Sequence, residues 1–392
     1  MKYNFDEIIN RANTNSKKWN PDIYKATYNG HNDLLPLWVA DMDFRVAQPI
    51  LDSMSKIIEH GVLGYTGVDE EYYQAIINWN KKRKNSHIEK EWVVFTNGVV
   101  PAISFMVQTF TQKGDNILIQ TPVYHPFRMT TENNERNIVT NPLINNEGVY
   151  TIDFEDFERK IVDNNVKIFI LCNPHNPVGR VWTKEELCKT AEICKKHNVI
   201  MIVDEIHCDF VYEGYHHTSF GTLSEYADNA VICTAPSKTF NLAELQLSNI
   251  MIPNPELRKT FQAEMNKVFY SDANLFGQVS CQAAYEHGAQ WLDELLVYLQ
   301  GNITYIRDYL AEHLPKIHLI EPEGTYLLWM DFREYGLSPE ALNAQILKDA
   351  RIWFNEGSMF GPEGAGFMRI NIASPRGMII ETMERLGEVF GE

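Results

Sequence analysis

Two stretches decide the fold: KIFILCNPHNPVG (167–179) and VIMIVDEIHCD (199–209) each run from apolar residues directly into polar ones. The apolar parts carry no polar face, as strands of a parallel sheet must when crossover helices cover both sides. Residues 183–198 between them fit a helix, because Thr183 and Glu186 match a capping box ahead of an apolar stripe. Strand, helix and strand in this order predict an α/β domain.

The remainder of the chain extends this pattern in two parts. Four more short apolar runs have strand character, at Trp92–Thr96, Asn116–Gln120, Ala230–Cys233 and Ser248–Ile252. After about residue 285 the pattern becomes helix 292–314, strand 325–332, helix 339–350, strand 366–372 and a helix from Met378. We therefore expect a three-layer α/β/α large domain with a mainly parallel sheet over 46–288, and a smaller C-terminal α+β domain over 289–392. Residues 1–45 are expected to form an N-terminal arm and part of the small domain.

Composition excludes several classes of function. The 392 residues are 44% hydrophobic and 22% charged, which is typical of a well-cored globular protein. The formal charge of −17 repels nucleic acid and anionic lipid. No apolar run reaches the roughly 18 to 20 residues of a membrane helix, and the first residues lack a signal peptide's apolar stretch. We expect a cytoplasmic protein that binds neither nucleic acid nor membrane.

Cysteine and histidine spacing predicts no metal site. The six cysteines form no CxxC pair and lie in apolar segments, so we expect reduced core thiols. No Cys and His cluster has zinc-ligand spacing. His216 and His217 are expected to be solvated loop residues.

Polar clusters follow three of the predicted strands, at 173–179, 204–209 and 235–241. In an open α/β sheet, ligands bind beyond the carboxyl ends of the parallel strands, so these clusters are expected to face one crevice. They supply an amide, a carboxylate, an imidazole, a hydroxyl and an amine: Asn176, Asp204, His207, Ser237 and Lys238. A partly desolvated lysine can lose its proton and attack a carbonyl to form a Schiff base.

A glycine turn follows the strand at Trp92–Thr96. It reads Asn97, Gly98, Val99, and it leads into an apolar helix. The free N–H groups at such a helix start can bind a phosphate, although a tight connection without any ligand uses the same residues.

These motifs resemble those of fold-type I pyridoxal 5′-phosphate (PLP) enzymes of the class I/II aminotransferase superfamily. Within it, the chain is most similar to the cystathionine β-lyases of the MalY/PatB group. Eight stretches carry the resemblance in family order, across nearly the whole chain: WVADMDF (38–44), GYTG (64–67), TNGVVPAI (96–103), TPVYHPF (121–127), NPHNPVGR (173–180), VDEIH (203–207), TAPSKTFNLA (234–243) and MRINIASPR (368–376).

The resemblance implies a role for each residue around the cofactor ring. Lys238 would form the Schiff base with PLP and then move the proton at the substrate Cα. Asp204 would pair with the pyridinium nitrogen, and Asn176 would hydrogen-bond the ring hydroxyl. Tyr124 would stack on the ring face. His207 would lie near the ring hydroxyl, with a satisfied structural histidine as the alternative.

The resemblance also implies phosphate and substrate contacts. Gly98 and Val99, with Ser237, would hold the phosphate. Arg369 would bind the α-carboxylate of a small amino-acid substrate in a bidentate fork. Tyr65 would reach in from the second subunit, which implies a homodimer with shared active sites.

One position departs from the family pattern. Glu244 stands where the family has glycine in SKTFNLAGLQ. If this residue needs a positive φ, glutamate would be strained by about 1 kcal/mol or more. An inward carboxylate could also perturb Lys238, whereas an outward one would be harmless.

The resemblance favours α,β-elimination from cystathionine or a related cysteine S-conjugate, which yields thiol, pyruvate and ammonia. Two alternatives stay open at this point. A class I/II aminotransferase would share the first half of the reaction. A catalytically impaired cofactor-binding or regulatory protein would keep the fold without turnover.

Overall fold

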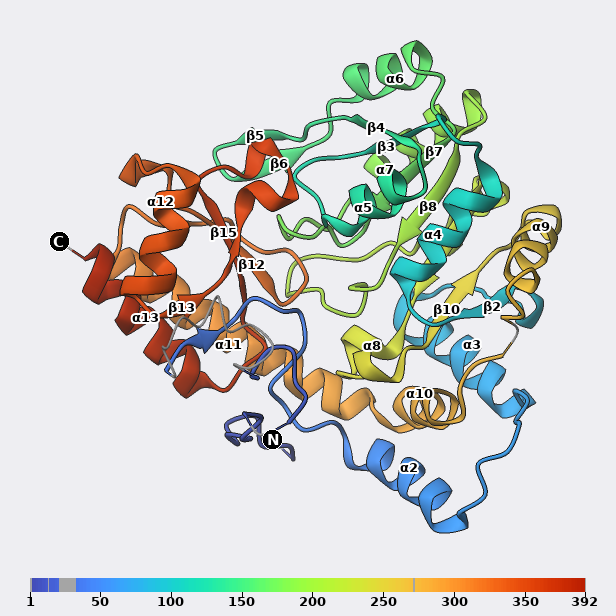
Figure 1. Cartoon of the computed structure of the whole chain (residues 1–392), viewed down its shortest axis with the longest axis horizontal. Coiled ribbons are helices and arrows are strands. Elements are labelled where there is room, and N and C mark those ends of the chain that lie inside the picture. Colours follow the sequence, from blue (N-terminus) through green and yellow to red (C-terminus); the bar gives the residue numbers. More distant parts are fainter. Residues whose placement is uncertain (1, 13, 21–32, 271, 392) are drawn as a thin grey trace.

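A seven-stranded sheet forms the centre of the larger part of the protein (Figure 1). The computed structural model describes residues 2–12, 14–20, 33–270 and 272–391. In sheet order the strands are β2 (Val93–Thr96), β10 (Ser248–Met251), β9 (Ala230–Thr234), β8 (Ile200–Asp204), β7 (Ile168–Cys172), β3 (Asn116–Ile119) and β4 (Asn137–Thr140). Neighbours from β9 to β4 are parallel, and β10 is antiparallel to both of its neighbours. All six strands predicted for this region are confirmed, and so is the mainly parallel sheet.

Helices cover both faces of this sheet, which is why its strands are apolar throughout. In β7, Ile168, Ile170 and Cys172 belong to one core, while Phe169 and Leu171 belong to the other. The first core is closed by α4 (Val99–Phe110), α5 (Pro126–Asn133) and α9 (Pro255–Asn266). The second receives buried side chains from α2 (Gln48–His60), α3 (Glu70–Lys84), α6 (Phe154–Asp163), α7 (Lys184–Lys196) and α10 (Leu275–His287). The three-layer α/β/α arrangement is therefore confirmed.

The start of α7 has the predicted local geometry, and α2 ends at a glycine. Thr183 and Glu186 form a full capping box at the start of α7. Gly61 ends α2 in the left-handed conformation, with φ 75°.

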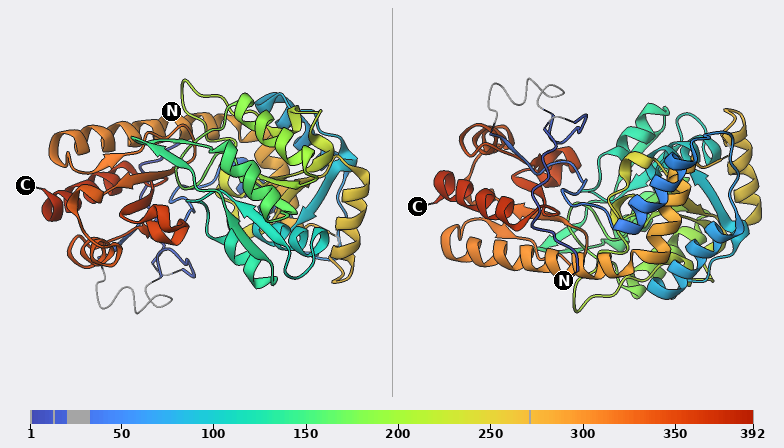
Figure 2. Two further views of the ribbon diagram at one scale, coloured as in Figure 1. Left: turned by 90° about the horizontal axis from the view of Figure 1, so that it is seen from above. Right: turned by 90° about the horizontal axis from the view of Figure 1, so that it is seen from below.

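A second, four-stranded antiparallel sheet lies beside the first (Figure 1). Its order is β11 (His318–Leu319), β12 (Leu327–Asp331), β15 (Phe367–Asn371) and β14 (Asn355–Glu356). The long helix α11 (Ala289–His313) runs into this part of the molecule, which also contains α12 (Pro339–Ala344) and α13 (Arg376–Phe390) (Figure 2). The expected α+β pattern is present, and the domain boundaries at residues 45 and 288 stay a prediction.

Strands β4, β11 and β14 lie outside the sequence prediction, and so do four strands of two or three residues that form two pairs. The N-terminal strand β1 (Leu35–Pro36) pairs in parallel with β13 (Ile352–Trp353), close to the second sheet. A hairpin of β5 (Ile144–Asn146) and β6 (Val149–Thr151) is the other addition. Each of these four strands has only two or three residues, too few for a period of two to be visible.

The cysteines are free thiols, and five of the six are buried, as expected for core residues. Among the described residues, no helix combines the length and the apolar character that a membrane span requires.

A buried ion cluster attaches the N-terminal arm to the rest of the chain. Asp43 accepts hydrogen bonds of 2.7 Å from Lys18 Nζ, Arg11 Nη1, Trp19 Nε1 and Ser374 Oγ. Burial alone would raise the pKa of Asp43, but the Lys18 charge and these hydrogen bonds hold the pKa below its usual value. The Asp43 carboxylate is therefore ionised, and it attaches the arm by binding Arg11, Lys18 and Trp19.

Asp43→Asn tests this attachment. Arg11 keeps its 2.6 Å salt bridge to Asp41, but the fully buried Lys18 is left with Asp41 at 3.7 Å, so the free energy of unfolding should fall by about 3 kcal/mol. Urea denaturation followed by circular dichroism measures the change. Glu7→Gln, which removes the exposed Glu7–Arg45 pair, is the control and should change stability little. Equal stability of Asp43→Asn and wild type would show that the cluster does not hold the arm.

Candidate active site

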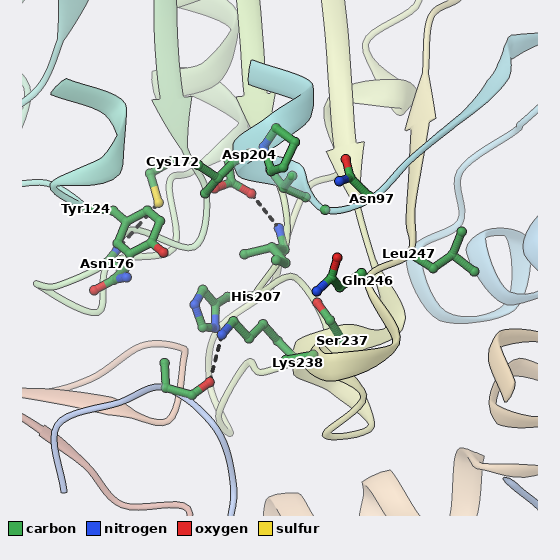
Figure 3. A pocket seen from close by; sticks show the side chains of 17 residues that line it. Asn97, Tyr124, Cys172, Asn176, Asp204, His207, Ser237, Lys238, Gln246 and Leu247 are labelled. Carbon is green, nitrogen blue, oxygen red and sulfur yellow. Dashed lines mark hydrogen bonds between the residues drawn. The ribbon is translucent and has the colours of Figure 1, made fainter. Parts of the chain in front are cut away.

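A cavity of about 180 Å³ opens at the carboxyl edge of β7, β8 and β9 (Figure 3). The edge residues Cys172 and Asp204 line it, and so does Lys238, from α8 (Pro236–Thr239) after β9. The predicted convergence of the three polar clusters in one crevice is therefore confirmed. Figure 3 shows Asp204, His207 and Lys238 directed into the same space.

Lys238 is held inside this cavity by one hydrogen bond. Its Nζ donates to the main-chain oxygen of Ala40 at 2.7 Å (Figure 3). Burial, with a smaller effect from the Arg369 charge, lowers the pKa of Lys238 to about 8, although the Asp41 and Asp204 carboxylates act in the opposite direction. A fraction of the amine is thus neutral, and nucleophilic, near pH 7.

Asp204, the last residue of β8, is a buried carboxylate. Its Oδ1 accepts a hydrogen bond from the Ile206 N–H at 3.1 Å. Burial raises the pKa of Asp204 to about 7, even though this hydrogen bond and the Lys238 charge favour the ionised form. A cationic N–H group inside the cavity would lower that pKa and keep the carboxylate charged.

His207 is buried against the rings of Tyr326 and Phe210, with centroids 5.5 and 6.4 Å away. Burial lowers its pKa well below the usual value, so the ring is neutral. Within the described part of the chain its Nδ1 has no hydrogen-bond partner. The alternative of a satisfied structural histidine is therefore wrong, and the ring lines the cavity with polar capacity unused.

Tyr124 and Asn176 line the side of the cavity next to Cys172 (Figure 3). The Tyr124 N–H donates to the Asn176 main-chain oxygen at 3.0 Å, which ties the two loops together. Burial raises the pKa of the Tyr124 hydroxyl, so it stays protonated.

The glycine turn lines another part of the cavity. Gly98 has φ 132°, a backbone conformation that residues with a side chain rarely adopt, so the turn requires glycine. Val99 and Val100 begin α4 here, where backbone N–H groups lack intrahelical acceptors. Ser237 and Gln246 line the cavity as well. The backbone N–H groups at the start of α4 and the side chains of Ser237 and Gln246 together supply hydrogen-bond donors for an anion.

Arg369, on β15, is not among the residues that line the cavity. It contacts Asn176, which does line the cavity. Its buried guanidinium donates to Asn176 Oδ1 at 3.0 Å and to the Trp38 main-chain oxygen at 3.1 Å. It also donates to Asn355 Oδ1 at 2.5 Å and lies 4.8 Å from the Phe360 ring centroid. Burial lowers the pKa of Arg369 to about 10. All these partners are neutral, which leaves a buried cation suited to an anionic ligand.

Two predicted features lie away from the cavity. Tyr65 is fully exposed in a segment without regular structure between α2 and α3, and it is not among the residues that line the cavity of its own chain. Glu244 is exposed and is not among the residues of positive φ, so the condition for strain is not met and the alternative of an outward side chain holds. The left-handed position of this loop is Gln246, with φ 47°.

Sequence reasoning missed several groups of the site. The Ala40 carbonyl accepts hydrogen bonds from Lys238 and also from Tyr326 Oη, at 3.0 Å. Asn355 orients Arg369, and Gln246 lines the cavity. A main-chain acceptor leaves no signal in a sequence, although Ala40 does lie inside the quoted WVADMDF stretch.

Comparisons with known proteins agree on one family. The sequence profile described as aminotransferase class I and II matches residues 33–386. The cystathionine β-lyase PatB of Bacillus subtilis is 41% identical over 98% of each chain. A crystal structure of a PLP-bound putative aminotransferase from Clostridium difficile has a TM-score of 0.96 at 43% identity, and covers 99% of this chain and 100% of its own. The PLP-bound C–S lyase from Staphylococcus hominis has a TM-score of 0.92 at 36% identity, and covers 100% and 99%.

The fold and the lysine at the sheet edge define a fold-type I PLP-dependent enzyme. The chain belongs to the aminotransferase class I and II family, with cystathionine β-lyases among its relatives at 41% identity.

The lowered pKa of Lys238 predicts how its reactivity changes with pH. Only the neutral amine attacks an electrophile, so acetylation of Lys238 by acetic anhydride should rise with pH and level off above about pH 8. An exposed lysine of ordinary pKa, about 10.4, should continue to rise beyond that point. Peptide mass spectrometry of briefly treated, cofactor-free protein gives both rates. If Lys238 follows the exposed lysines across the whole range, its pKa is not lowered and its amine is not buried in solution.

Proposed function

We propose that this protein is a PLP-dependent carbon–sulfur β-lyase. It would act on cystathionine or a related cysteine S-conjugate in the cytoplasm, and with one water yield a thiol, pyruvate and ammonia. The observation that carries the proposal is the partly desolvated Lys238 amine in one cavity with the buried Asp204 carboxylate. The likeness to cystathionine β-lyases and C–S lyases supports elimination as the reaction.

The residues present fit PLP. Asp204 is a carboxylate whose pKa is raised by burial, and a pyridinium N–H beside it would lower that pKa and keep it ionised. The turn at Gly98 and Val99, with Ser237, offers donors for the phosphate. Tyr124, Asn176 and His207 line the cavity between these ends and would contact the ring. When bound, PLP supplies an aldehyde for the lysine amine and an electron sink for the substrate Cα.

Three side chains of this protein would carry the chemistry. Lys238 would take the proton from the substrate Cα, since burial keeps its pKa low enough for the neutral form to be available. Asp204 would stay ionised and hold the positive charge of the ring nitrogen. Arg369 would bind the substrate carboxylate, because its buried guanidinium has only neutral partners among the described residues.

The site would be completed by a second copy of the chain in a homodimer. Residues 61–67 are exposed, and three of their apolar side chains are more than 60% exposed: Val62, Leu63 and Tyr65. Exposed apolar groups in an extended segment favour burial against a partner. Tyr65 would then reach the partner's cavity.

Pyruvate formation without a keto-acid acceptor tests the proposed reaction. The purified protein is incubated with cystathionine and added PLP, and pyruvate and free thiol are assayed. We expect both products in equal amounts. An aminotransferase would form no pyruvate under these conditions and would require a keto acid. A protein that binds PLP but neither eliminates from cystathionine nor transfers its amino group to a keto acid would be a cofactor-binding regulator. Lys238→Ala is the control for background pyruvate formation.

Arg369 variants test the substrate contact. Arg369→Lys keeps a charge but loses the bidentate fork, which costs about 1.5 to 3 kcal/mol, or roughly 10- to 150-fold in KM. The kcat value should change much less if the contact is equal in the ground and transition states. The methyl ester of the same substrate is the matched comparison, because the variant should discriminate less between acid and ester. Unchanged kinetics with both substrates would remove Arg369 from the site.

A further inference from the structure

A second cavity, of about 300 Å³, lies next to the segment that carries Asp204 and His207. Cys208, Asp209 and His217 line it, together with the last residues of α3, Lys82–Lys84. Asp204 and His207 line the cofactor cavity, while Cys208 lines this second one. The proposed lyase reaction uses none of the residues around the second cavity.

Three metal-binding side chains meet at this cavity. One potential ligand atom from each of Glu205, Cys208 and His217 lies within 4.8 Å of the other two, and all three residues are buried. Their spacing in the sequence, two residues and then eight, matches no common zinc motif. This explains why the spacing analysis predicted no metal site.

His217 gives an independent sign that a ligand is missing. The prediction of a solvated loop residue is wrong, because only 6% of His217 is exposed. Within the described residues neither ring nitrogen makes a hydrogen bond, and Nε2 lies 3.5 Å from Glu205 Oε2. Nδ1 therefore has no partner among the described residues, and the contact of Nε2 with the Glu205 carboxylate is a long one. A buried imidazole with unused hydrogen-bonding capacity is costly, and coordination of one nitrogen would relieve part of that cost.

The chain around His217 is anchored so that the ring points inward. The Glu205 carboxylate accepts hydrogen bonds from Ser219 Oγ at 2.9 Å and from the Phe220 N–H at 2.5 Å. These bonds draw residues 217–220 towards the segment after β8. Glu205 keeps further lone pairs for a cation, since a carboxylate has about four acceptor positions.

The charges of the cluster suit a divalent cation. Glu205 carries one negative charge, and Cys208 would carry another once a metal displaces the thiol proton. Lys84 is the neighbouring cation, and Asp209 lies beside it. Burial alone would lower the pKa of Lys84, but Asp209, Cys208 and Glu205 raise that pKa, so the ammonium stays charged. Lys84 faces Asp209, Cys208 and Glu205 together, and Lys82 and Arg83 also line the cavity, so a metal would compete with these cations for the negative charges of Glu205 and Cys208.

We propose that Glu205, Cys208 and His217 form a Zn²⁺ site, with the fourth position open to the second cavity. A thiolate, an imidazole and a carboxylate are zinc ligands, and the thiolate disfavours Mg²⁺ and Ca²⁺. The bound ion would connect the segment at 205–208 to the loop at 217. Since this segment also carries His207 and follows Asp204, the metal would stiffen one wall of the cofactor cavity.

Metal binding by the untagged, cofactor-loaded protein tests the site. The protein is first treated with a chelator, then exposed to Zn²⁺ or Co²⁺, and free metal is removed by gel filtration. We expect about one zinc per chain by elemental analysis. Cobalt should give visible d–d bands of tetrahedral intensity and a thiolate charge-transfer band in difference spectra. Cys208→Ser and His217→Gln should bind at least about tenfold more weakly.

Matched controls separate loss of the site from loss of the fold. Cys188→Ser removes a partly exposed thiol and His87→Gln an exposed imidazole, and both should bind zinc as wild type does. Circular dichroism and retained PLP absorbance check folding, and added zinc should raise the Tm of wild type but not of Cys208→Ser.

Three results would overturn the proposal. Wild type could retain no zinc, or Cys208→Ser could retain as much as wild type. Zinc could also bind only when Lys84→Gln removes the neighbouring ammonium, which would mean that Lys84 alone satisfies the cluster. None of these results depends on lyase activity, so they are distinct from a failure of the proposed function.

Discussion

The main-chain carbonyls of the segment 38–42 accept hydrogen bonds from side chains on both sides of the cavity, and the arrangement of the site depends on these contacts. Lys238 binds the Ala40 oxygen from the large-sheet side, and Arg369 binds the Trp38 oxygen from the small sheet. Asn371 donates to the oxygens of Val39 and Asp41, at 2.7 and 2.6 Å. One backbone segment without regular structure therefore sets the relative positions of the reactive amine and the buried guanidinium. The ion cluster around Asp43 attaches the next part of this segment to the N-terminal arm.

The hydrophobic pattern was sufficient to predict the central sheet, because both faces of each parallel strand are buried and the apolar runs are unbroken. The polar residues after β7, β8 and β9 could be predicted to share a crevice for a simple geometric reason: parallel strands end at one edge. Helix α7 was predictable from Thr183 and Glu186, whose side chains cap it locally. These features depend on neighbouring residues or on one topological rule, and so they are readable in the sequence.

The features that were not predictable depend on tertiary contacts. The Ala40 carbonyl carries no side-chain signal, and Asn355 reaches Arg369 only because β14 and β15 are paired. His217 looks like a loop residue, but Glu205 binds Ser219 and Phe220 and draws the loop inward. Glu244 was a plausible source of strain until the backbone placed the left-handed residue two positions later, at Gln246. The role of Tyr65 stays a prediction, because it requires a second copy of the chain. The domain boundaries also stay a prediction.

The end of β8 and the residues after it, 204–208, contribute side chains to two neighbouring sites, so the position of this segment affects both of them. Asp204 and His207 line the cofactor cavity, whereas Glu205 and Cys208 meet His217 near the second one. The Glu205 N–H donates to the Cys233 main-chain oxygen at 2.9 Å, so the start of the segment is held to β9. A shift of the segment towards either cavity would therefore move ligating groups on both sides at once.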